Sequence, residues 1–414
     1  MGKHYEHVKG TVDFYPPQSS LFQNIVKEAR NLFILYGYEE IILPILETEA
    51  VFAKGVGSTS DIVEKQIFRI QDKDIVLRPE GTAQVVRSYI ENSCSKQSDV
   101  HKFFYIGPMF RGERPQKGRL RQFHHIGAEV FGVENPALDG EVIALAYMVL
   151  QKSGIKNITL KLNTLGCAQD KEKFSARLQK DLQAHHAKLC ELCQKRVSVN
   201  PLRVLDCKDP SCKKIVASLS LGKGHLCDEC QDHFHKVTET LKALSVPFEY
   251  DPFLVRGLDY YTNTVFEFIS SALGAQDACG AGGRYNNLVK NLGGPDVPAI
   301  GFALGVERML LLREDFKSPP VVNVFVAYTG ETLASEARTL VYELRRQGVS
   351  ADMSYKPKSL KSQLRVAQRL GAVCTVIFGE EERKEGCLTL RNMRESTQQK
   401  IAVEDIIPAL KNKI

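Results

Sequence analysis

Two apolar stretches joined by a strongly basic loop constrain the fold more than any other part of the chain. The stretches run from Phe103 to Phe131, and the loop between them carries four arginines and one lysine. Apolar and aromatic runs on either side of such a loop predict a β-hairpin. Guanidinium groups at its tip suit a polyphosphate, because each is a planar donor that binds phosphate oxygens in pairs. We therefore expect an antiparallel sheet with an anion-binding loop.

Other segments also favour hairpins over alternating strands and helices. Residues 67–70 and 75–78 flank a polar turn and predict a second hairpin, which leads into a helix after Pro79-Glu-Gly-Thr82. Apolar residues at helical spacing predict a helix over 21–36, and residues 39–47 predict an edge strand after it, together a candidate dimer surface. The pattern predicts an α+β fold built on an antiparallel sheet, not a dinucleotide-binding fold.

A second cluster of polar residues begins at Arg256 and includes Asp259, Tyr260 and Tyr261, just before residues 264–268 alternate like a strand. The arginine offers a planar fork for phosphate or carboxylate, and the phenols reach polar atoms. Such a cluster suits an anionic or zwitterionic ligand. The alternative is an ordinary strand with an Arg–Asp pair on its rim.

Length and composition set broad limits. With 414 residues, 43% of them hydrophobic, the chain can bury a large core and is expected to form two to four domains. The formal net charge is only +6, but the last quarter carries an excess of Lys and Arg, which indicates a polyanionic partner there. No apolar run approaches membrane-spanning length and no signal peptide is evident, so we expect a cytoplasmic protein.

Shifts in composition divide the chain. Residues 167–248 are rich in Lys, His and Cys and poor in strand signals, which predicts a helical insertion between two parts of one core, residues 1–166 and 249–317. Ser318-Pro-Pro320 is the expected linker, residues 318–320. Strands and helices alternate over 321–414 and predict a compact α/β unit.

The insertion contains most of the eleven cysteines, which in a chain without export signals indicate reduced thiols or a metal site rather than disulfides. Four of them form two CxxC pairs: Cys190, Cys193, Cys227 and Cys230. Each pair can offer two thiolates, so the four predict a zinc site, with Cys207 and Cys212 between them. The gap between the pairs exceeds the usual spacing, and reduced thiols remain the alternative.

A basic stripe is predicted on a helix near residues 359–370. Its members recur at helical spacing without an acid among them: Lys358, Lys361, Arg365 and Arg369. Taken alone, such a stripe is usually a solvated face, and phosphate contact is the second interpretation.

Four local patterns, together with the helix over 21–36, Gly37-Tyr38 and Pro44, resemble motifs of the histidyl-tRNA synthetase family among the class II aminoacyl-tRNA synthetases, and the match runs nearly end to end. They are Phe110-Arg-Gly-Glu-Arg114, Leu254-Val-Arg-Gly-Leu-Asp-Tyr-Tyr261, Cys279-Gly-Ala-Gly-Gly-Arg-Tyr285 and Ala299-Ile-Gly-Phe-Ala-Leu-Gly-Val-Glu-Arg308. The resemblance implies a class II catalytic core over 1–166 and 249–317 and an anticodon-binding domain over 321–414. It implies activation of L-histidine by ATP with Mg²⁺, transfer to the 3′ end of tRNA(His), and a homodimer.

The resemblance also implies roles for residues around ATP. Arg111 is expected at the α-phosphate, Arg256 at the substrate carboxylate and the same phosphoryl group, and Arg308 at the distal phosphate. Glu113 is expected to accept from the adenine amino group while Phe123 stacks on the ring. Arg111 and Arg256 are the predicted catalytic residues, since the reaction requires two anions to be aligned and charge to be absorbed.

The residues implied for histidine binding are Glu80, Thr82, His125, Glu129, Arg256, Tyr260 and Tyr261. A buried carboxylate beside the imidazole would reject ligands that lack its N–H donor, although a glutamate is more often a helix cap or a surface acid. The family usually has Gln at position 125. Because an imidazolium there would repel the substrate ammonium, we expect activity to fall more steeply on acidification than in a His125→Gln variant.

For tRNA, the resemblance implies that Gln116 and Arg121 lie near the acceptor end and that Lys358, Lys361, Arg365 and Arg369 contact phosphates. A different class of protein stays open: a non-catalytic paralogue that serves as a regulatory subunit of ATP phosphoribosyltransferase. Such chains typically lose the catalytic cations and lack the RNA domain, whereas this one retains Arg111, Arg256, Arg308 and Glu80.

Overall fold

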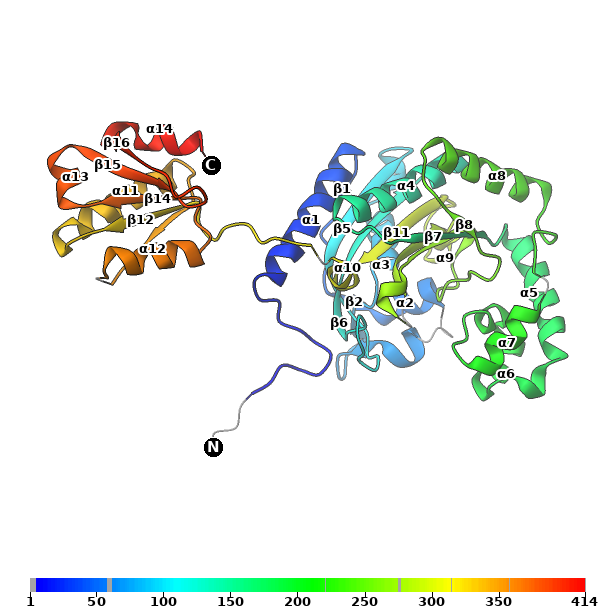
Figure 1. Cartoon of the computed structure of the whole chain (residues 1–414). Coiled ribbons are helices and arrows are strands. Elements are labelled where there is room, and N and C mark those ends of the chain that lie inside the picture. The colour runs from blue at the N-terminus through cyan, green and yellow to red at the C-terminus, as the bar shows by residue number, and fades with distance from the viewer. Residues whose placement is uncertain are drawn as a thin grey trace. The chain divides into compact units, whose positions relative to one another are not determined.

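The computed structural model describes residues 5–57, 62–219, 221–274, 277–313, 315–356 and 358–413. The chain forms two compact units, Met1–Phe316 and Lys317–Ile414 (Figure 1). The predicted linker, residues 318–320, comes directly after the boundary. The outermost ends of the predicted domains, residues 1 and 414, lie outside the described residues.

An eight-stranded sheet forms the centre of the first unit, in the order β1-β5-β6-β11-β10-β9-β7-β8. The predicted basic hairpin is its longest pair, β5 (His101–Phe110) with β6 (Gln122–Phe131). The other strands are β1 (Glu39–Glu40), β7 (Thr159–Thr164), β8 (Glu249–Tyr250), β9 (Thr262–Ile269), β10 (Ala278–Arg284) and β11 (Ala299–Gly305). Neighbours are antiparallel except at the two edges, β1 with β5 and β7 with β8. The α+β fold with an antiparallel sheet is confirmed.

Three helices cover one face of this sheet: α1 (Gln18–Leu35), α4 (Pro136–Lys152) and α8 (Asp228–Ala243) (Figure 1). Their apolar residues form one cluster with the strand residues on that face. In α1 the predicted helical spacing is seen in the burial of Leu21, Ile25 and Phe33, and the Phe33 ring stacks on Phe104 of β5 at 4.8 Å. This face is therefore filled with hydrophobic core.

A buried ion pair ties α4 to the sheet. Asp139 of α4 pairs with Arg284 of β10, and both side chains have no exposed area. Asp139 Oδ2 also accepts from the Thr264 hydroxyl at 2.6 Å and lies 3.0 Å from His233 Nε2 of α8. A buried charge is tolerated when it is paired and hydrogen-bonded, so this cluster fixes α4, α8, β9 and β10 together.

The opposite face carries α2 (Glu49–Val56), α3 (Thr82–Glu91) and α9 (Leu288–Asn291). Beside them lies a small sheet of β2 (Leu46–Thr48), β4 (Ile75–Leu77) and β3 (Phe68–Arg69). The predicted hairpin of residues 67–78 is its β3–β4 pair.

The prediction of one edge strand over residues 39–47 is wrong. Residues 39–40 join the large sheet as β1, whereas β2 begins only at Leu46 and joins the small sheet. Between them, the buried Arg78 donates to the carbonyls of Leu43 and Pro44 at 3.0 and 3.3 Å. A side chain thus satisfies backbone acceptors that a strand would have placed in a ladder.

The insertion is helical, as its composition predicts. It consists of α5 (Ala168–Gln183), α6 (Glu191–Val199), α7 (Pro210–Ser218) and finally α8. Phe174, Leu178 and Leu182 of α5 are buried with residues of α6 and α7 in one apolar cluster. Phe234 and Leu241 of α8 belong instead to the core beneath the large sheet. The insertion therefore leaves from β7 and ends on the sheet core.

The second unit is a five-stranded sheet with helices, in the strand order β13-β12-β14-β15-β16. The strands are β12 (Val324–Tyr328), β13 (Ala351–Met353), β14 (Cys374–Phe378), β15 (Cys387–Asn392) and β16 (Gln398–Ala402). The helices are α11 (Ala334–Arg346), α12 (Leu360–Arg369), α13 (Glu380–Lys384) and α14 (Ile406–Lys411). Strand β12 is parallel to both of its neighbours, β13 and β14, whereas the β14–β15 and β15–β16 pairs are antiparallel. The sequence did not predict α13 or β16, which are short; α13 is almost wholly exposed, and β16 is exposed over its first three residues.

Candidate active site

A cavity of about 750 Å³ opens beside the large sheet. Ten of the eleven residues predicted to bind ATP or histidine line it: Glu80, Thr82, Arg111, Glu113, Phe123, His125, Arg256, Tyr260, Tyr261 and Arg308. They come from β6, the start of α3, the loop after β5, the segment before β9 and helix α10 (Val306–Leu312). The eleventh, Glu129, is fully buried and bonded to Thr82. Segments far apart in sequence thus meet in one cavity.

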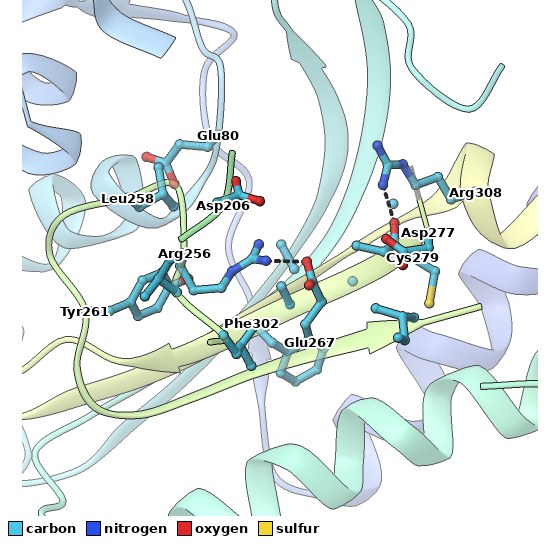
Figure 2. Close-up of a pocket in the computed structure, with 18 of the residues that line it drawn as sticks. Glu80, Asp206, Arg256, Leu258, Tyr261, Glu267, Asp277, Cys279, Phe302 and Arg308 are labelled. Atoms are coloured by element: carbon cyan, nitrogen blue, oxygen red, sulfur yellow. Dashed lines mark hydrogen bonds and ion pairs between the residues drawn. The ribbon is translucent and has the colours of Figure 1, made fainter. Parts of the chain in front are cut away.

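Three arginines converge on this cavity. Arg256 pairs with Glu267 of β9, Arg111 donates to the Pro79 carbonyl at 2.9 Å, and Arg308 donates to the Gly118 carbonyl at 3.0 Å (Figure 2 shows Arg256 and Arg308). Burial lowers the pKa of Arg111 and of Arg308, and in both cases repulsion from Arg256 adds to the effect. The three guanidinium groups therefore repel one another, and an anion bound among them would reduce that repulsion.

Arg256 has an unused donor. Its Nε is buried and makes no hydrogen bond to any residue that the structure describes. Burying such a donor costs free energy unless a partner satisfies it. A ligand carboxylate or phosphate oxygen in the cavity would be that partner. The alternative of an Arg–Asp pair does not describe this side chain, because Asp259 pairs with Arg203.

The other wall of the cavity is acidic. Glu80 accepts from the backbone N–H groups of Thr82 and Ala83 at 2.7 and 2.9 Å, so it caps α3 as well as lining the cavity. Burial raises the pKa of Glu80, against the effect of these backbone bonds. Glu80 therefore acts as a helix cap, as the alternative for this glutamate held, and the same side chain also lines the cavity.

Glu129 of β6 lies behind Thr82. The Thr82 hydroxyl donates to Glu129 Oε1 at 2.7 Å, and the Tyr285 hydroxyl donates to Oε2 at 2.5 Å. Burial raises the pKa of Glu129 to about 8, although these two hydrogen bonds oppose the shift. The carboxylate fits only because a glycine faces it: a Cβ at Gly301 would lie 1.7 Å from Oε2. Glu129 is thus a fully buried acceptor whose two oxygens are fixed by side-chain hydrogen bonds.

The two residues predicted to hold adenine, Glu113 and Phe123, both line the cavity. The Arg111 guanidinium lies 5.2 Å from the centre of the Phe123 ring, which is a cation–π contact. Glu113 forms an ion pair with Arg119 of the same basic loop. An adenine amino group would therefore share this carboxylate with Arg119.

His125 is partly buried beside Phe123, with ring centres 5.1 Å apart. Burial, and then the positive charge of Arg111, hold its pKa well below the ordinary value of 6.5. Its Nδ1 has no hydrogen-bond partner among the described residues. This direction of the pKa shift favours a neutral imidazole with a spare nitrogen, contrary to the expectation that mild acidification charges the ring.

Some residues of the site had no role in the sequence prediction. Tyr105 and Tyr285 complete the polar wall, and Tyr285 packs against Tyr260 with ring centres 5.6 Å apart. Tyr105 stands opposite Gly127 in the β5–β6 ladder, where any Cβ would meet its ring. That glycine in an apolar strand was the available signal. Glu267 alternates with the buried Phe266 and Phe268, so strand periodicity already places it on the cavity face.

The residues predicted to contact tRNA do not line the cavity. Gln116 forms a backbone bridge with Arg119 in the basic loop, and Arg121 donates to the Glu113 carbonyl at 3.3 Å. The basic stripe lies in the second unit: Lys361, Arg365 and Arg369 are exposed on α12, and Lys358 is exposed two residues before it. The four basic residues are all exposed, as a basic stripe requires, but α12 begins after Lys358.

The prediction of one zinc site from the two CxxC pairs is corrected. The structure places Cys190 and Cys193 in one group with Cys207 and Cys212. It places Cys227 and Cys230 in a second group with Cys167 and Asp170. The pairs are separated because each opens a different helix, α6 or α8, and each helix packs on its own neighbours.

Comparison with known proteins gives consistent matches. A family model described as histidyl-tRNA synthetase matches residues 10–309, and one described as anticodon binding domain matches residues 323–413. A histidine–tRNA ligase of Halothermothrix orenii is 43% identical over 96% of this chain and 97% of its own, and one of Syntrophotalea carbinolica is 43% identical over 98% of each.

Solved structures are similar as well. The apo histidyl-tRNA synthetase of S. aureus has a TM-score of 0.80 at 31% identity and covers 99% of this chain and 100% of that one. A protein of Bacillus halodurans described as an ATP phosphoribosyltransferase regulatory subunit/histidyl-tRNA synthetase has a TM-score of 0.66 at 20% identity, which shows a shared fold alone. No helix in the described part of the chain is long and apolar enough to cross a membrane.

Proposed function

The chain belongs to the histidyl-tRNA synthetase family, and on that premise we propose which of its residues perform each step. The activity is that of a histidine–tRNA ligase: ATP and L-histidine give histidyl-adenylate and pyrophosphate, and the histidyl group then passes to the 3′ end of tRNA(His). Relatives of this name match along nearly the whole chain, which favours the enzyme over the regulatory-subunit alternative.

One observation carries the assignment of residues: three guanidinium groups converge in a cavity that also holds buried acids. In activation, the histidine carboxylate attacks the α-phosphorus, so two anions must approach and the new negative charge must be absorbed. Arg256, with its unused Nε, is proposed to hold the carboxylate and the α-phosphoryl group. Arg111 takes the α-phosphate from the other side, and Arg308 takes the distal phosphate.

ATP-dependent ligases of this family work with Mg²⁺, which neutralises charge on the polyphosphate. A hard cation prefers oxygen ligands, and Glu267 and Asp277 are carboxylates in the cavity wall close to Arg256 and Arg308 (Figure 2). These two side chains fit such an ion. Phe123 and Glu113 are proposed to hold the adenine.

The acidic wall is proposed to read histidine. Glu80 and Thr82 receive the ammonium group, and the spare nitrogen of neutral His125 accepts from it as well. Glu129 accepts from the imidazole N–H, with its position fixed by Thr82 and Tyr285. Tyr260 and Tyr261 close the pocket around the ring. A ligand without that N–H would lose its hydrogen bond to this buried carboxylate, which is how such a site excludes isosteres.

The ligase activity is tested by isotope exchange between pyrophosphate and ATP. The purified chain should exchange label only when L-histidine is present, because the adenylate forms only with its own amino acid. The control replaces L-histidine by histidinol or by a different amino acid. Absence of exchange, together with stimulation of an ATP phosphoribosyltransferase, would instead establish the regulatory alternative.

The state of His125 gives a prediction. Because burial keeps the ring neutral, wild type and His125→Gln should lose exchange activity in parallel between about pH 8 and pH 6. The measurement is kcat/KM for histidine at closely spaced pH values in both proteins. A steeper acid loss in wild type would show that an imidazolium forms in the site.

Contact with tRNA is proposed at two places. Gln116 and Arg121 of the basic loop face the acceptor end, and the stripe on α12 binds backbone phosphates. Neutralising Lys361 and Arg365 to Gln should weaken tRNA binding at every sequence and reduce the slope of log K against log salt by about two. Filter binding over a salt series measures this slope.

The control variant neutralises Arg383 and Lys400 in the same unit. Both are exposed but already pair with Glu336 and Glu385. The control should keep the wild-type slope, whereas an unchanged slope in the α12 variant would remove the stripe from the interface.

Three further parts of the proposal concern the dimer, the domain boundaries and the cysteines. We propose a homodimer, supported by exposed apolar residues at the end of α1 and just beyond β1: Leu35 is 78% exposed and Ile42 is 91% exposed. We propose the division into a core of residues 1–166 and 249–317, an insertion of residues 167–248 and an anticodon-binding domain from residue 321. We also propose that cysteines of the insertion hold structural zinc.

A further inference from the structure

The cysteine-rich insertion contains two separate groups of metal-ligand side chains. One comprises Cys190, Cys193, Cys207 and Cys212, and the other comprises Cys167, Asp170, Cys227 and Cys230. Within each group the ligand atoms all lie within 4.8 Å of one another. Four thiolates at about 2.3 Å from a tetrahedral zinc ion stand about 3.8 Å apart, so each group needs only a small contraction. We propose that each group binds one zinc ion, two ions per chain.

The first group has the local structure of a thiolate site. Cys190 is the residue before α6, Cys193 lies in its first turn, and Cys212 lies in the first turn of α7. The Cys190 and Cys207 sulfurs are 3.9 Å apart. Backbone N–H groups point at sulfur: Cys190 N lies 3.3 Å from Cys212 Sγ, and Asp209 N lies 3.4 Å from Cys207 Sγ. Such donors orient thiolates and stabilise their charge.

The second group lies where two helices begin. Cys167 precedes α5 and Asp170 lies in its first turn; Cys227 precedes α8 and Cys230 lies in its first turn. Two hydrogen bonds join the starts of the two helices: Cys167 N donates to Cys230 Sγ at 3.1 Å, and Cys227 N donates to Asp170 Oδ2 at 3.0 Å. Positive helix ends favour negative ligand atoms.

An independent observation at the second group is the state of Asp170. This residue has no exposed area, and its Oδ1 makes no hydrogen bond with the described residues. The nearest cation that pairs with it is Lys173, with Nζ 3.9 Å from Oδ1. A buried carboxylate oxygen without a donor is costly. A zinc ion bound by three sulfurs and this oxygen removes the cost.

The ligand types select the metal. Thiolates are soft ligands and bind zinc far better than the magnesium that accompanies ATP. With four protein ligands, each site is closed, which is the form of structural rather than catalytic zinc. If the thiols are simply reduced, the convergence of eight possible metal-ligand side chains has no explanation. Disulfides within the groups are the remaining alternative to zinc.

The two sites would act on different parts of the fold. The second joins the first and last helices of the insertion, whose α5 to α7 lie together in Figure 1, and so closes the inserted segment at its base. The first holds the turn that contains Cys207, and its neighbours Asp206 and Lys208 line the active-site cavity. Zinc in the first site would therefore fix part of the cavity wall.

The proposal extends the zinc prediction, and its test does not depend on ligase activity. The full-length chain, purified under reducing conditions and supplied with Zn²⁺, is analysed for metal and protein in the same sample. We expect two zinc ions per chain. The Cys207→Ser/Cys212→Ser variant and the Cys227→Ser/Cys230→Ser variant should each retain one, and the control Cys387→Ser should retain two because that residue lies in the second unit.

A second measurement keeps the test decisive if a variant does not fold. Wild type reconstituted with Co²⁺ should show thiolate-to-metal absorption that saturates at two ions per chain. One ion per chain that is lost in both double variants would establish a single shared site and overturn the proposal. Absence of bound metal, or a mass loss that indicates disulfides in the reduced-purified protein, would overturn it as well.

Discussion

Replacing Arg256 by glutamine is expected to lower histidine-dependent pyrophosphate exchange by about a hundredfold or more, which corresponds to about 2.7 kcal/mol of transition-state stabilisation. The guanidinium lines the cavity, is held by Glu267, and has a buried Nε without a hydrogen-bond partner among the described residues. Glutamine cannot supply a cation where negative charge develops between carboxylate and α-phosphate. The loss should appear mainly in kcat, measured by steady-state exchange at saturating ATP and histidine.

Two further variants separate this role from a general loss of charge. Arg256→Lys keeps the charge but not the planar fork, so its activity should lie between those of wild type and Arg256→Gln. Arg69→Gln breaks an exposed ion pair with Glu49 away from the cavity and should change exchange by no more than about twofold. Similar losses in Arg256→Gln and Arg69→Gln would mean that Arg256 is only a rim salt bridge.

The cationic half of the site could be predicted because its residues stand in hairpins and strands that local pattern identifies. The apolar runs on either side of the basic loop fixed β5 and β6, and with them Arg111 and Phe123. Strand alternation before Phe268 put Glu267 on the face of the cavity. In these cases a period of two along the chain determines the side of the sheet.

Other features depend on contacts between distant segments, which no local pattern reports. Arg284, in a glycine-rich motif, forms an ion pair with Asp139 in the core and does not face a ligand site. The cysteine pairs were visible, but Cys167 and Asp170, the partners of the second pair, lie at the start of α5, far from α8 in sequence. The neutral state of His125 follows from burial and from Arg111, and only the tertiary structure supplies either.

Glu129→Gln is the second substitution with a large expected effect, now on histidine recognition. Glu129 is proposed to accept from the histidine imidazole, and losing a buried polar partner of a ligand costs about 2–5 kcal/mol, so KM for histidine should rise about thirtyfold or more. KM for ATP should change little, because Glu129 contacts Thr82 and Tyr285 rather than the arginines. The matched control is Glu47→Gln, a 9% exposed carboxylate paired with Arg87 outside the cavity, which should leave both KM values unchanged.

The stability of the same variant shows whether the loss of recognition reflects chemistry or misfolding. Burial raises the pKa of Glu129 to about 8, above the ordinary value of 4.5, so the folded chain without substrate binds a proton that the unfolded chain releases as the pH rises. Between these two pKa values the free energy of unfolding therefore falls with rising pH. Glu129→Gln lacks this ionisation and should lose less stability than wild type when denaturant unfolding is compared between about pH 5 and pH 8. A variant with a high KM and the wild-type slope would contradict this description of Glu129, because its carboxylate would then ionise without cost in the folded protein.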